Sequence, residues 1–247
     1  MRRILVFIVA AILAVPALAQ ERERILLPVF TGPVHGAHGS EFHTDLRILN
    51  KSDHDVTILG LTQNCPACLP PQNQYTLGPG EEIEPNDVLP LGNPGRFITV
   101  AQNDISELSM NLRVYDVTRD AFNFGTEIPI VPEHGFTLNE IVLVGIPTDS
   151  RFRNTLRIYA QVPGGLQVTI GNRPPVKVEL RPGHDEFEPA YAMLTDFPVD
   201  AGTVRVTIEL DPDIVSLLPI EIPLWAMVTV TNNDTQAITT ITPQPGR

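Results

Sequence analysis

The sequence lacks the motifs of the common catalytic families. It contains no His-Glu-x-x-His zinc motif, no Gly-x-Ser-x-Gly nucleophile motif and no phosphate-binding glycine loop. Its 29 acidic residues allow so many carboxylate pairs that a glycosidase pair cannot be singled out. We therefore expect a non-catalytic protein that uses no cofactor.

The chain is also poor in basic residues. Lysine and arginine together number 17 against 29 acidic residues, for a net charge of −12, and lysine occurs only as Lys51 and Lys177. No basic stripe offsets the dispersed acids. A polyanion would be repelled by such a surface, so nucleic acid is excluded as a partner.

After residue 15 the sequence has no apolar run long enough to span a bilayer, so we expect no membrane span in the mature chain. At the N-terminus, two arginines precede an apolar run over residues 4–15, Pro16 and a small-residue pattern that ends at Ala19. This order is typical of a secretory signal peptide. A membrane anchor, the alternative, needs roughly 20 apolar residues. We predict a signal peptide over residues 1–19 and an exported protein, periplasmic or extracellular.

Long helices are not expected, because 24 prolines lie mostly between short apolar runs. Residues 204–210 alternate apolar and polar side chains with the period of a strand, as do residues 45–48. Further strands are predicted over residues 56–61, 97–101, 108–118, 126–131, 140–144, 167–170, 225–231 and 237–242. The best helical candidate is a turn or two over residues 190–195, after Pro189.

An internal repeat organises the chain. Residues 44–48 return as residues 154–158 with the shared Leu-Arg-Ile, and the strand that begins at Val56 returns at Val168. Later segments keep this order, and residues 112–118 align with 225–231. A unit of about 110 residues with strands between turns has the size of an immunoglobulin-like sandwich.

We therefore predict an all-β fold of two tandem immunoglobulin-like antiparallel β-sandwich domains, over residues 20–134 and 135–247. The alternative is one continuous two-sheet domain in which the similarity reflects only generic strand pattern. A strand over residues 24–30, if it forms an exposed sheet edge, would support self-association. The oligomeric state and the orientation of the two domains stay open.

Three segments carry a resemblance: residues 39–50, which begin Gly-Ser-Glu-Phe-His-Thr-Asp-Leu, residues 124–129 and residues 152–156. In these segments the chain resembles a group of secreted bacterial proteins with tandem β-sandwich repeats of the type Gly-Ser-x-aromatic-x-Thr-x-Leu. The resemblance covers most of the mature chain and implies the fold, and no activity comes with it. The chain departs from the group by its insertion of residues 64–68 and by a histidine-rich segment.

Cys65 and Cys68 are the only cysteines. An exported chain meets an oxidising compartment, and Pro66 favours a β-turn that brings the two thiols together. We predict a disulfide that locks this small loop and stabilises the fold by roughly 2 kcal/mol. The alternative, a redox-active pair, needs a lowered thiol pKa, commonly from a helix N-terminus. The proline-rich residues 69–73 do not favour such a helix.

His35, His38 and His43 lie close together in the sequence, beside Glu41. Imidazoles and a carboxylate can bind zinc or copper, so these residues are weak candidates for a metal site. We expect solvated loop histidines instead, with His43 and Glu41 on one face of a strand.

Calcium and glycan sites have weaker signals. Two acidic pairs, Asp53 with Asp55 and Asp211 with Asp213, could contribute to calcium sites but lack a full ligand set. A glycan site would require exposed aromatic rings. Trp225 is expected in the core, which leaves the modest candidates Tyr75 and Tyr191.

Three functional hypotheses follow. The first is a non-catalytic module, binding or structural, that presents loops or sheet edges to an unknown protein or glycan partner. The second is a metal-binding protein or metallohydrolase that uses residues 35–43. The third is a two-domain periplasmic chaperone of surface-fibre subunits, which would pair a sheet edge with its client. For its carboxylate anchor only Arg113 and Arg153 are candidates near the expected interdomain cleft.

Overall fold

The structure is a computed structural model. It describes residues 21–29, 33–61, 74–84, 95–119, 124–195, 203–211 and 222–243. The predicted signal peptide lies outside these residues. Within them, no helix combines the length and the apolar character that crossing a membrane requires.

The described residues fold into antiparallel strands, which confirms the all-β prediction. The first half of the chain contains β1 (Arg22–Leu27), β2 (Val34–His35), β3 (Glu41–Asn50), β4 (Val56–Leu59), β5 (Gln74–Leu77), β6 (Glu82–Ile83), β7 (Arg96–Ala101), β8 (Leu108–Asp116), β9 (Thr126–Glu127) and β10 (Val131–Pro132). The second half contains β11 (Ile141–Pro147), β12 (Phe152–Ala160), β13 (Gly165–Ile170), β14 (Val176–Glu179), β15 (Ala190–Leu194), β16 (Thr203–Leu210), β17 (Leu224–Asn232) and β18 (Ile238–Ile241). Short 3-10 turns cover Ala37–Gly39, Gln102–Glu107 and Glu133–Gly135.

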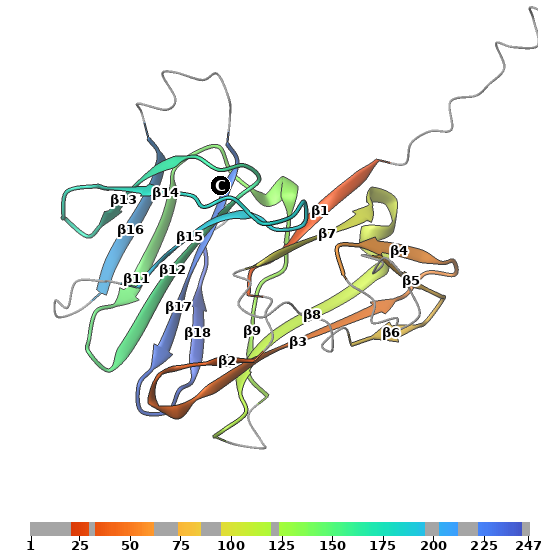
Figure 1. Ribbon diagram of the computed structural model, residues 1–247, viewed down its shortest axis with the longest axis horizontal. Helices are drawn as coiled ribbons and strands as arrows, with labels where there is room; N and C mark the ends of the chain where they lie inside the picture. Colours follow the sequence, from red (N-terminus) through yellow and green to blue (C-terminus); the bar gives the residue numbers. More distant parts are fainter. Residues whose placement is uncertain are drawn as a thin grey trace, which may run out of the picture.

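The strands form two sheets in each half, and the two halves lie side by side in Figure 1. In the first half one sheet has the order β10-β1-β7-β4-β5, and the other contains β2-β3-β8-β9 with β6 beside β3. In the second half the orders are β11-β16-β13-β14 and β15-β12-β17-β18. The series β1-β7-β4-β5 thus corresponds to β11-β16-β13-β14, and the series β3-β8-β9 corresponds to β12-β17-β18. In each case the strands follow one another along the chain in the same order.

Strand β17 is buried on both faces. Leu224, Ala226 and Val228 point into the core of the second half, whereas Trp225 and Met227, on the opposite face, belong to the core cluster of the first half. Burial on both faces explains why this strand is a nearly continuous apolar run rather than an alternating one. The sheet β15-β12-β17-β18 is therefore packed between the other sheet of its own half and the first half of the chain.

Tyr159 on β12 anchors this junction. Its ring stacks on Trp225 with the ring centroids 6.1 Å apart, and its hydroxyl donates a hydrogen bond to the Pro28 carbonyl in the first half. Full burial raises the pKa of Tyr159 to about 12. The backbone N–H of Phe97 also donates to the Phe187 carbonyl at 2.6 Å, so the halves are joined by both apolar packing and hydrogen bonds.

The predicted helix over residues 190–195 is wrong. This segment contains strand β15, which pairs with β12 from Ala160↔Ala190 to Leu156↔Leu194. Ala190 and Ala192 are buried and alternate with the more exposed Tyr191 and Met193, which is the two-residue period of a strand. A proline is as acceptable before a strand as at a helix start, so Pro189 does not decide between them.

The exposed sheet edge considered at residues 24–30 is not formed where the structure describes it. Strand β1 lies inside its sheet, paired with β7 on one side and β10 on the other. The predicted strand over residues 126–131 is split into β9 and β10, because β9 pairs with β8 in one sheet and β10 pairs with β1 in the other. The other strands predicted from the sequence are confirmed to within a few residues.

The structure corrects the end of the sequence repeat by three residues. Leu46 faces Leu112 across β3 and β8, and Leu156, its repeat counterpart, faces Val228 across β12 and β17. Leu112 therefore corresponds to Val228, not to Trp225. Side chains alternate between the two faces of a strand, so an error of three residues exchanges the faces. The sequence alignment had therefore matched Leu112 with Trp225, which lies on the opposite face of its sheet.

Asp116 ends β8 as a buried carboxylate. Its Oδ1 accepts hydrogen bonds from the Glu41 N–H, the Thr118 N–H and the Thr118 hydroxyl, and Arg119 lies 3.4 Å from Oδ2. Burial by itself raises the pKa of Asp116, but these hydrogen bonds and the arginine outweigh it and hold the pKa below its usual value.

We predict that Asp116 stabilises the fold in a pH-dependent way. A depressed folded-state pKa gives stability that is complete above the unfolded-state pKa of about 3.9 and is lost as the pH falls through the folded-state value. Urea unfolding at pH 7 and at decreasing pH should show the gap between wild type and Asp116→Asn closing in acid. The matched control is Asp53→Asn, whose carboxylate is fully exposed. A constant gap from pH 7 to below pH 3 would contradict this assignment.

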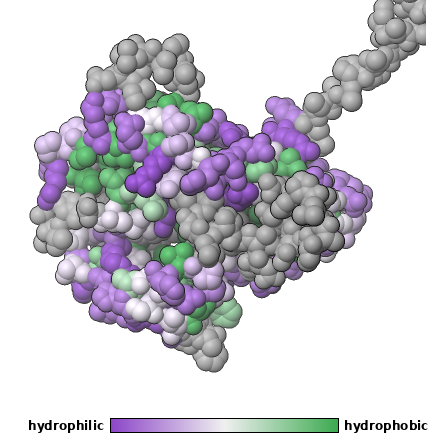
Figure 2. All heavy atoms as spheres, viewed as in Figure 1, coloured by the Kyte–Doolittle hydropathy of each residue, from purple (hydrophilic) through white to green (hydrophobic). Residues whose placement is uncertain are grey.

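Figure 2 shows hydrophilic residues over most of the described surface on the visible face, with hydrophobic residues in smaller groups between them. Large exposed apolar side chains are dispersed over several strands and loops, and Phe124 is the most exposed of those described at 81%. Such dispersed residues are normal for a protein surface.

Candidate functional site

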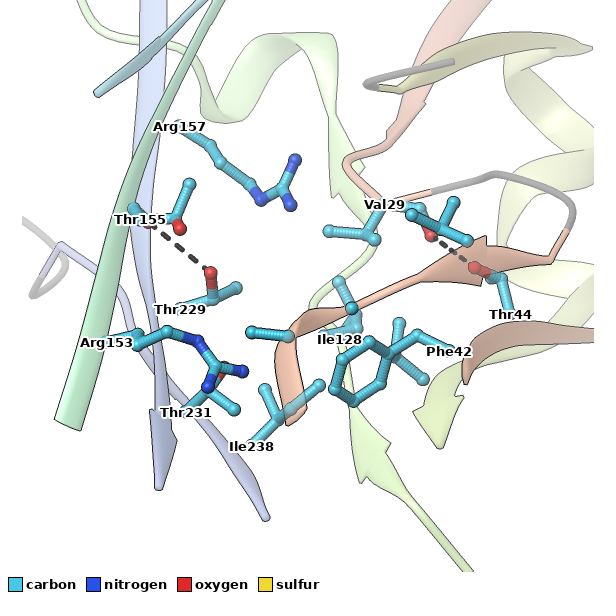
Figure 3. Close-up of a pocket in the computed structure, with 14 residues that line it drawn as sticks. Val29, Phe42, Thr44, Ile128, Arg153, Thr155, Arg157, Thr229, Thr231 and Ile238 are labelled. Carbon is cyan, nitrogen blue, oxygen red and sulfur yellow. Dashed lines mark hydrogen bonds between the residues drawn. The ribbon is translucent and has the colours of Figure 1, made fainter. Parts of the chain in front are cut away.

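A cavity of about 230 Å³ lies at the junction of the two halves (Figure 3). One wall is polar and comes from the second half, with Arg153, Thr155 and Arg157 on β12 and Thr229 and Thr231 on β17. These residues share one sheet face, because every second residue of a strand points the same way. Thr155 faces Thr229 and Arg153 faces Thr231 in the antiparallel register.

The opposite wall is apolar and comes mainly from the first half. In Figure 3 Val29, Phe42 and Ile128 face the polar wall, and Ile238 on β18 closes the lower end. Val114 also lines the cavity. Thr44 also lies on this wall, and its hydroxyl donates to the Val29 carbonyl at 3.2 Å. The cavity is therefore amphipathic, with cationic groups on one side and hydrocarbon on the other.

The cavity follows directly from how β12 and β17 are used. At one end of their shared face, Tyr159, Trp225 and Met227 pack tightly against the first half. Toward the other end the same face carries arginines and threonines, which do not fill the space against the apolar wall. Close packing thus gives way to a hollow along the same two strands.

Arg153 is held in place by neutral partners. Its two terminal nitrogens donate to Asn233 Oδ1 at 2.7 Å and Gln236 Oε1 at 2.8 Å, and Asn233 in turn donates to the Ser150 carbonyl. Burial, and secondarily the nearby charge of Arg119, lowers the pKa of Arg153. The side chain remains a cation, since arginine titrates far above neutral pH. Its charge has no carboxylate partner among the described residues.

Arg157 is the least satisfied group of the cavity. Its Nη1 donates to the Met193 sulfur at 3.1 Å, a weak acceptor, and the Tyr159 hydroxyl lies beside it. Its Nε is buried and has no hydrogen-bond partner within the described part of the chain. A buried charged donor without an acceptor is costly, so this atom marks a place where an acceptor fits.

A second hollow of about 440 Å³ shares Arg153, Thr155 and Thr231 with the cavity. Its remaining lining comes largely from the turn between β11 and β12, including Asp149 and Ser150. The two hollows therefore adjoin along β12 and β17, with Arg153 at their boundary.

The histidine segment is only partly assembled. His43 and Glu41 do share a face of β3, as predicted, with His43 Nε2 3.0 Å from Glu41 Oε1, and His35 Nδ1 lies 4.0 Å from the other oxygen. His38 sits in the adjacent turn with a positive φ of 57°. Across the described ranges, no group of three or more His, Cys, Asp or Glu residues is arranged to hold a metal ion. The metal hypothesis stays a prediction.

Cys65, Cys68 and Asp213 lie outside the described residues, so their predicted roles stay predictions. Asp211 is buried, and its carboxylate lies 2.9 Å from the Lys177 ammonium. This ion pair occupies the carboxylate that was considered as a calcium ligand. The side chain of Asp53 is fully exposed.

The aromatic residues are placed mostly as packing groups. Trp225 is buried, as predicted, although it packs at the junction of the halves, and Tyr75 and Tyr191 lie half-buried against the core cluster of the first half. A third hollow of about 430 Å³ lies on the outer face of β3 and β8, where Tyr115 and the exposed Phe124 accompany polar residues. Arg113 lines this hollow, where its Nε donates to Asn111 Oδ1 at 2.8 Å. Of the two arginines considered as carboxylate anchors, only Arg153 lines the junction cavity.

Nothing in the sequence pattern singles out Arg157, Thr155, Thr229 or the apolar wall as parts of a site. The alternation of β12 predicts a polar face but does not show whether water or another part of the chain covers it. A usable signal was present in Tyr159 and Trp225, large aromatic residues on this same face that call for a partner surface. No protein-family model matches the chain, and no curated protein matches it.

Proposed function

We propose that this protein is a non-catalytic binding module of the cell envelope or the extracellular space. In this proposal residues 1–19 direct export, and residues 20–134 and 135–247 form two immunoglobulin-like sandwiches. The strand order supports the fold assignment. The series β1-β7-β4 with β3-β8-β9, and β11-β16-β13 with β12-β17-β18, match the B-E-D and C-F-G order of an immunoglobulin sandwich.

The observation that carries the binding function is the junction cavity. Ligand sites are often found between packed domains, in concave pockets with apolar walls and a few well-placed polar groups. The cavity has this composition, and its polar wall rests on two central strands that are packed on both faces. The proposed ligand is a small molecule, because the cavity of about 230 Å³ is smaller than typical sites for drug-sized ligands, roughly 300–1,000 Å³.

The test blocks the cavity and asks whether small molecules still bind. Saturation-transfer NMR with 1-hexanol and sodium hexanoate as probes should show transfer from the wild-type protein to at least one of them. Thr229→Phe places a ring in the cavity and should abolish the transfer. The matched control is Thr239→Phe, the same change at an exposed position of the adjacent strand β18, which should leave it unchanged.

Two results would overturn the binding function: no transfer to either probe at millimolar concentration, or equal transfer from wild type and the folded Thr229→Phe variant. Circular dichroism spectra of the three proteins establish that they share one fold.

A further inference from the structure

Charge selects the ligand of the junction cavity. Many described arginines have a carboxylate within 4.0 Å, as in the pairs Arg24–Glu133, Arg119–Asp116 and Arg205–Glu140. In a chain with an excess of acidic residues such pairing is expected. Arg153 and Arg157 have no carboxylate partner among the described residues, and no described lining residue of the cavity is acidic. The cavity is thus a local positive site in an acidic protein, and it favours an anion.

The two arginines have different parts in this site. Arg153 is already engaged by two side-chain amides, so it contributes mainly its charge. Arg157 offers a buried Nε without a partner. The guanidinium edge formed by Nε and one Nη fits the two oxygens of a carboxylate in parallel hydrogen bonds. Arg157 is therefore the contact residue, and Arg153 raises the local potential.

The part of the ligand that does not contact Arg157 lies against the apolar wall of the cavity. In Figure 3 the guanidinium of Arg157 points from β12 into the space bounded on the far side by Val29 and Ile128. The ring of Phe42 lies on the same apolar side. A phosphate ion or a sugar would leave its polar groups against these side chains without partners, which is unfavourable. An apolar tail on the ligand instead buries these side chains away from water, which is favourable.

We infer that the cavity binds a small monocarboxylate with an apolar tail, its carboxylate on Arg157 and its tail against Val29, Phe42 and Ile128. This inference rests on the proposed binding function and specifies its ligand class. The size of the cavity restricts the tail to a short chain or a single ring.

The experiment compares probes of equal chain length and different charge. Dissociation constants of hexanoate, 1-hexanol and hexylamine, and of acetate as the anion without a tail, are measured by chemical-shift titration on the full mature protein. Hexanoate should bind about tenfold or more tightly than hexanol, because only hexanoate forms the charge-assisted hydrogen bonds. It should also bind about tenfold or more tightly than acetate, which has no tail to bury. Hexylamine should bind most weakly.

Variants assign the charge effect to one side chain. Arg157→Met keeps most of the apolar volume and should weaken hexanoate about tenfold while leaving hexanol within about threefold. Arg157→Lys should recover part of the loss, because it restores the charge without the two-pronged geometry. Arg113→Met removes an arginine from the outer hollow of β3 and β8 and should change neither affinity.

The outcomes separate the two proposals. If hexanol or hexylamine binds as well as hexanoate to the wild-type protein, the carboxylate inference is overturned and the binding function stands. If no probe binds, both fall. The comparison of probes on wild type needs no variant, so it decides the carboxylate inference even if Arg157→Met does not fold.

Discussion

Replacing Trp225 with alanine is expected to lower the free energy of unfolding by about 3–5 kcal/mol, the usual range for truncation of a buried tryptophan. Trp225 is 7% exposed and fills the junction between the halves, where it stacks on Tyr159. Its loss leaves a cavity among side chains from both halves, which can collapse only if the halves move relative to each other. The effect is therefore on the stability of the whole chain.

Equilibrium unfolding in urea, followed by circular dichroism, measures the change, and calorimetry shows whether the halves unfold in one transition or in two. We expect Trp225→Ala to separate the unfolding into two transitions where the wild type shows one, because an apolar contact between the halves is lost. The control is Thr229→Ala on the same face of β17, which should cost less than about 1 kcal/mol, since it loses only a 3.4 Å hydrogen bond to the Thr155 carbonyl. A loss below about 1 kcal/mol for Trp225→Ala would show that the junction contributes little to stability.

Arg96→Ala should be the second strongly destabilising change, by about 2–3 kcal/mol. Arg96 is nearly fully buried at the start of β7, and its Nε donates to the Gly60 carbonyl. Its guanidinium lies 5.5 Å from the ring centroid of Phe187 and 3.4 Å from Asp185, both in the second half. Alanine removes the donor from a buried carbonyl and the cation from the Phe187 ring, and both losses raise the free energy of the folded state.

A matched exposed pair distinguishes burial from charge. Arg205 forms a 3.0 Å ion pair with Glu140 in which both side chains are about half exposed. Arg205→Ala should therefore cost less than about 1 kcal/mol in the same urea experiment. Equal losses for Arg96→Ala and Arg205→Ala would mean that Arg96 acts only as a surface charge.

Local pattern was sufficient for many of the longer strands. The period of two around Leu46 and over residues 204–210 led to β3 and β16, since alternation depends only on the pleat of a strand. It failed over residues 190–195, where Ala190, Ala192 and Met193 suit a helix as well as a strand. There the pairing with β12 decided the outcome, a contact between residues 30 to 38 positions apart.

The candidate site was much harder to foresee. The sequence drew attention to the histidines of residues 35–43 and to Arg153, because these residue types carry recognisable chemistry. Arg157 and Thr229 are unremarkable in the sequence, since arginine and threonine on alternate positions of a strand usually face water. Their role as cavity residues depends on Val29 and Phe42, which lie more than 100 positions away in the chain.

By itself, then, the sequence determined the all-β class, the positions of many of the longer strands and the polar and apolar faces of β12, because each follows from side-chain alternation within a few residues. Only the tertiary structure decided that the polar face of β12 and β17 lies against the first half of the chain. That contact is made by Tyr159, Trp225 and Met227 across the junction, and it is set by packing between distant segments. Where this packing ends, the arginines remain enclosed opposite hydrocarbon, and the cavity results.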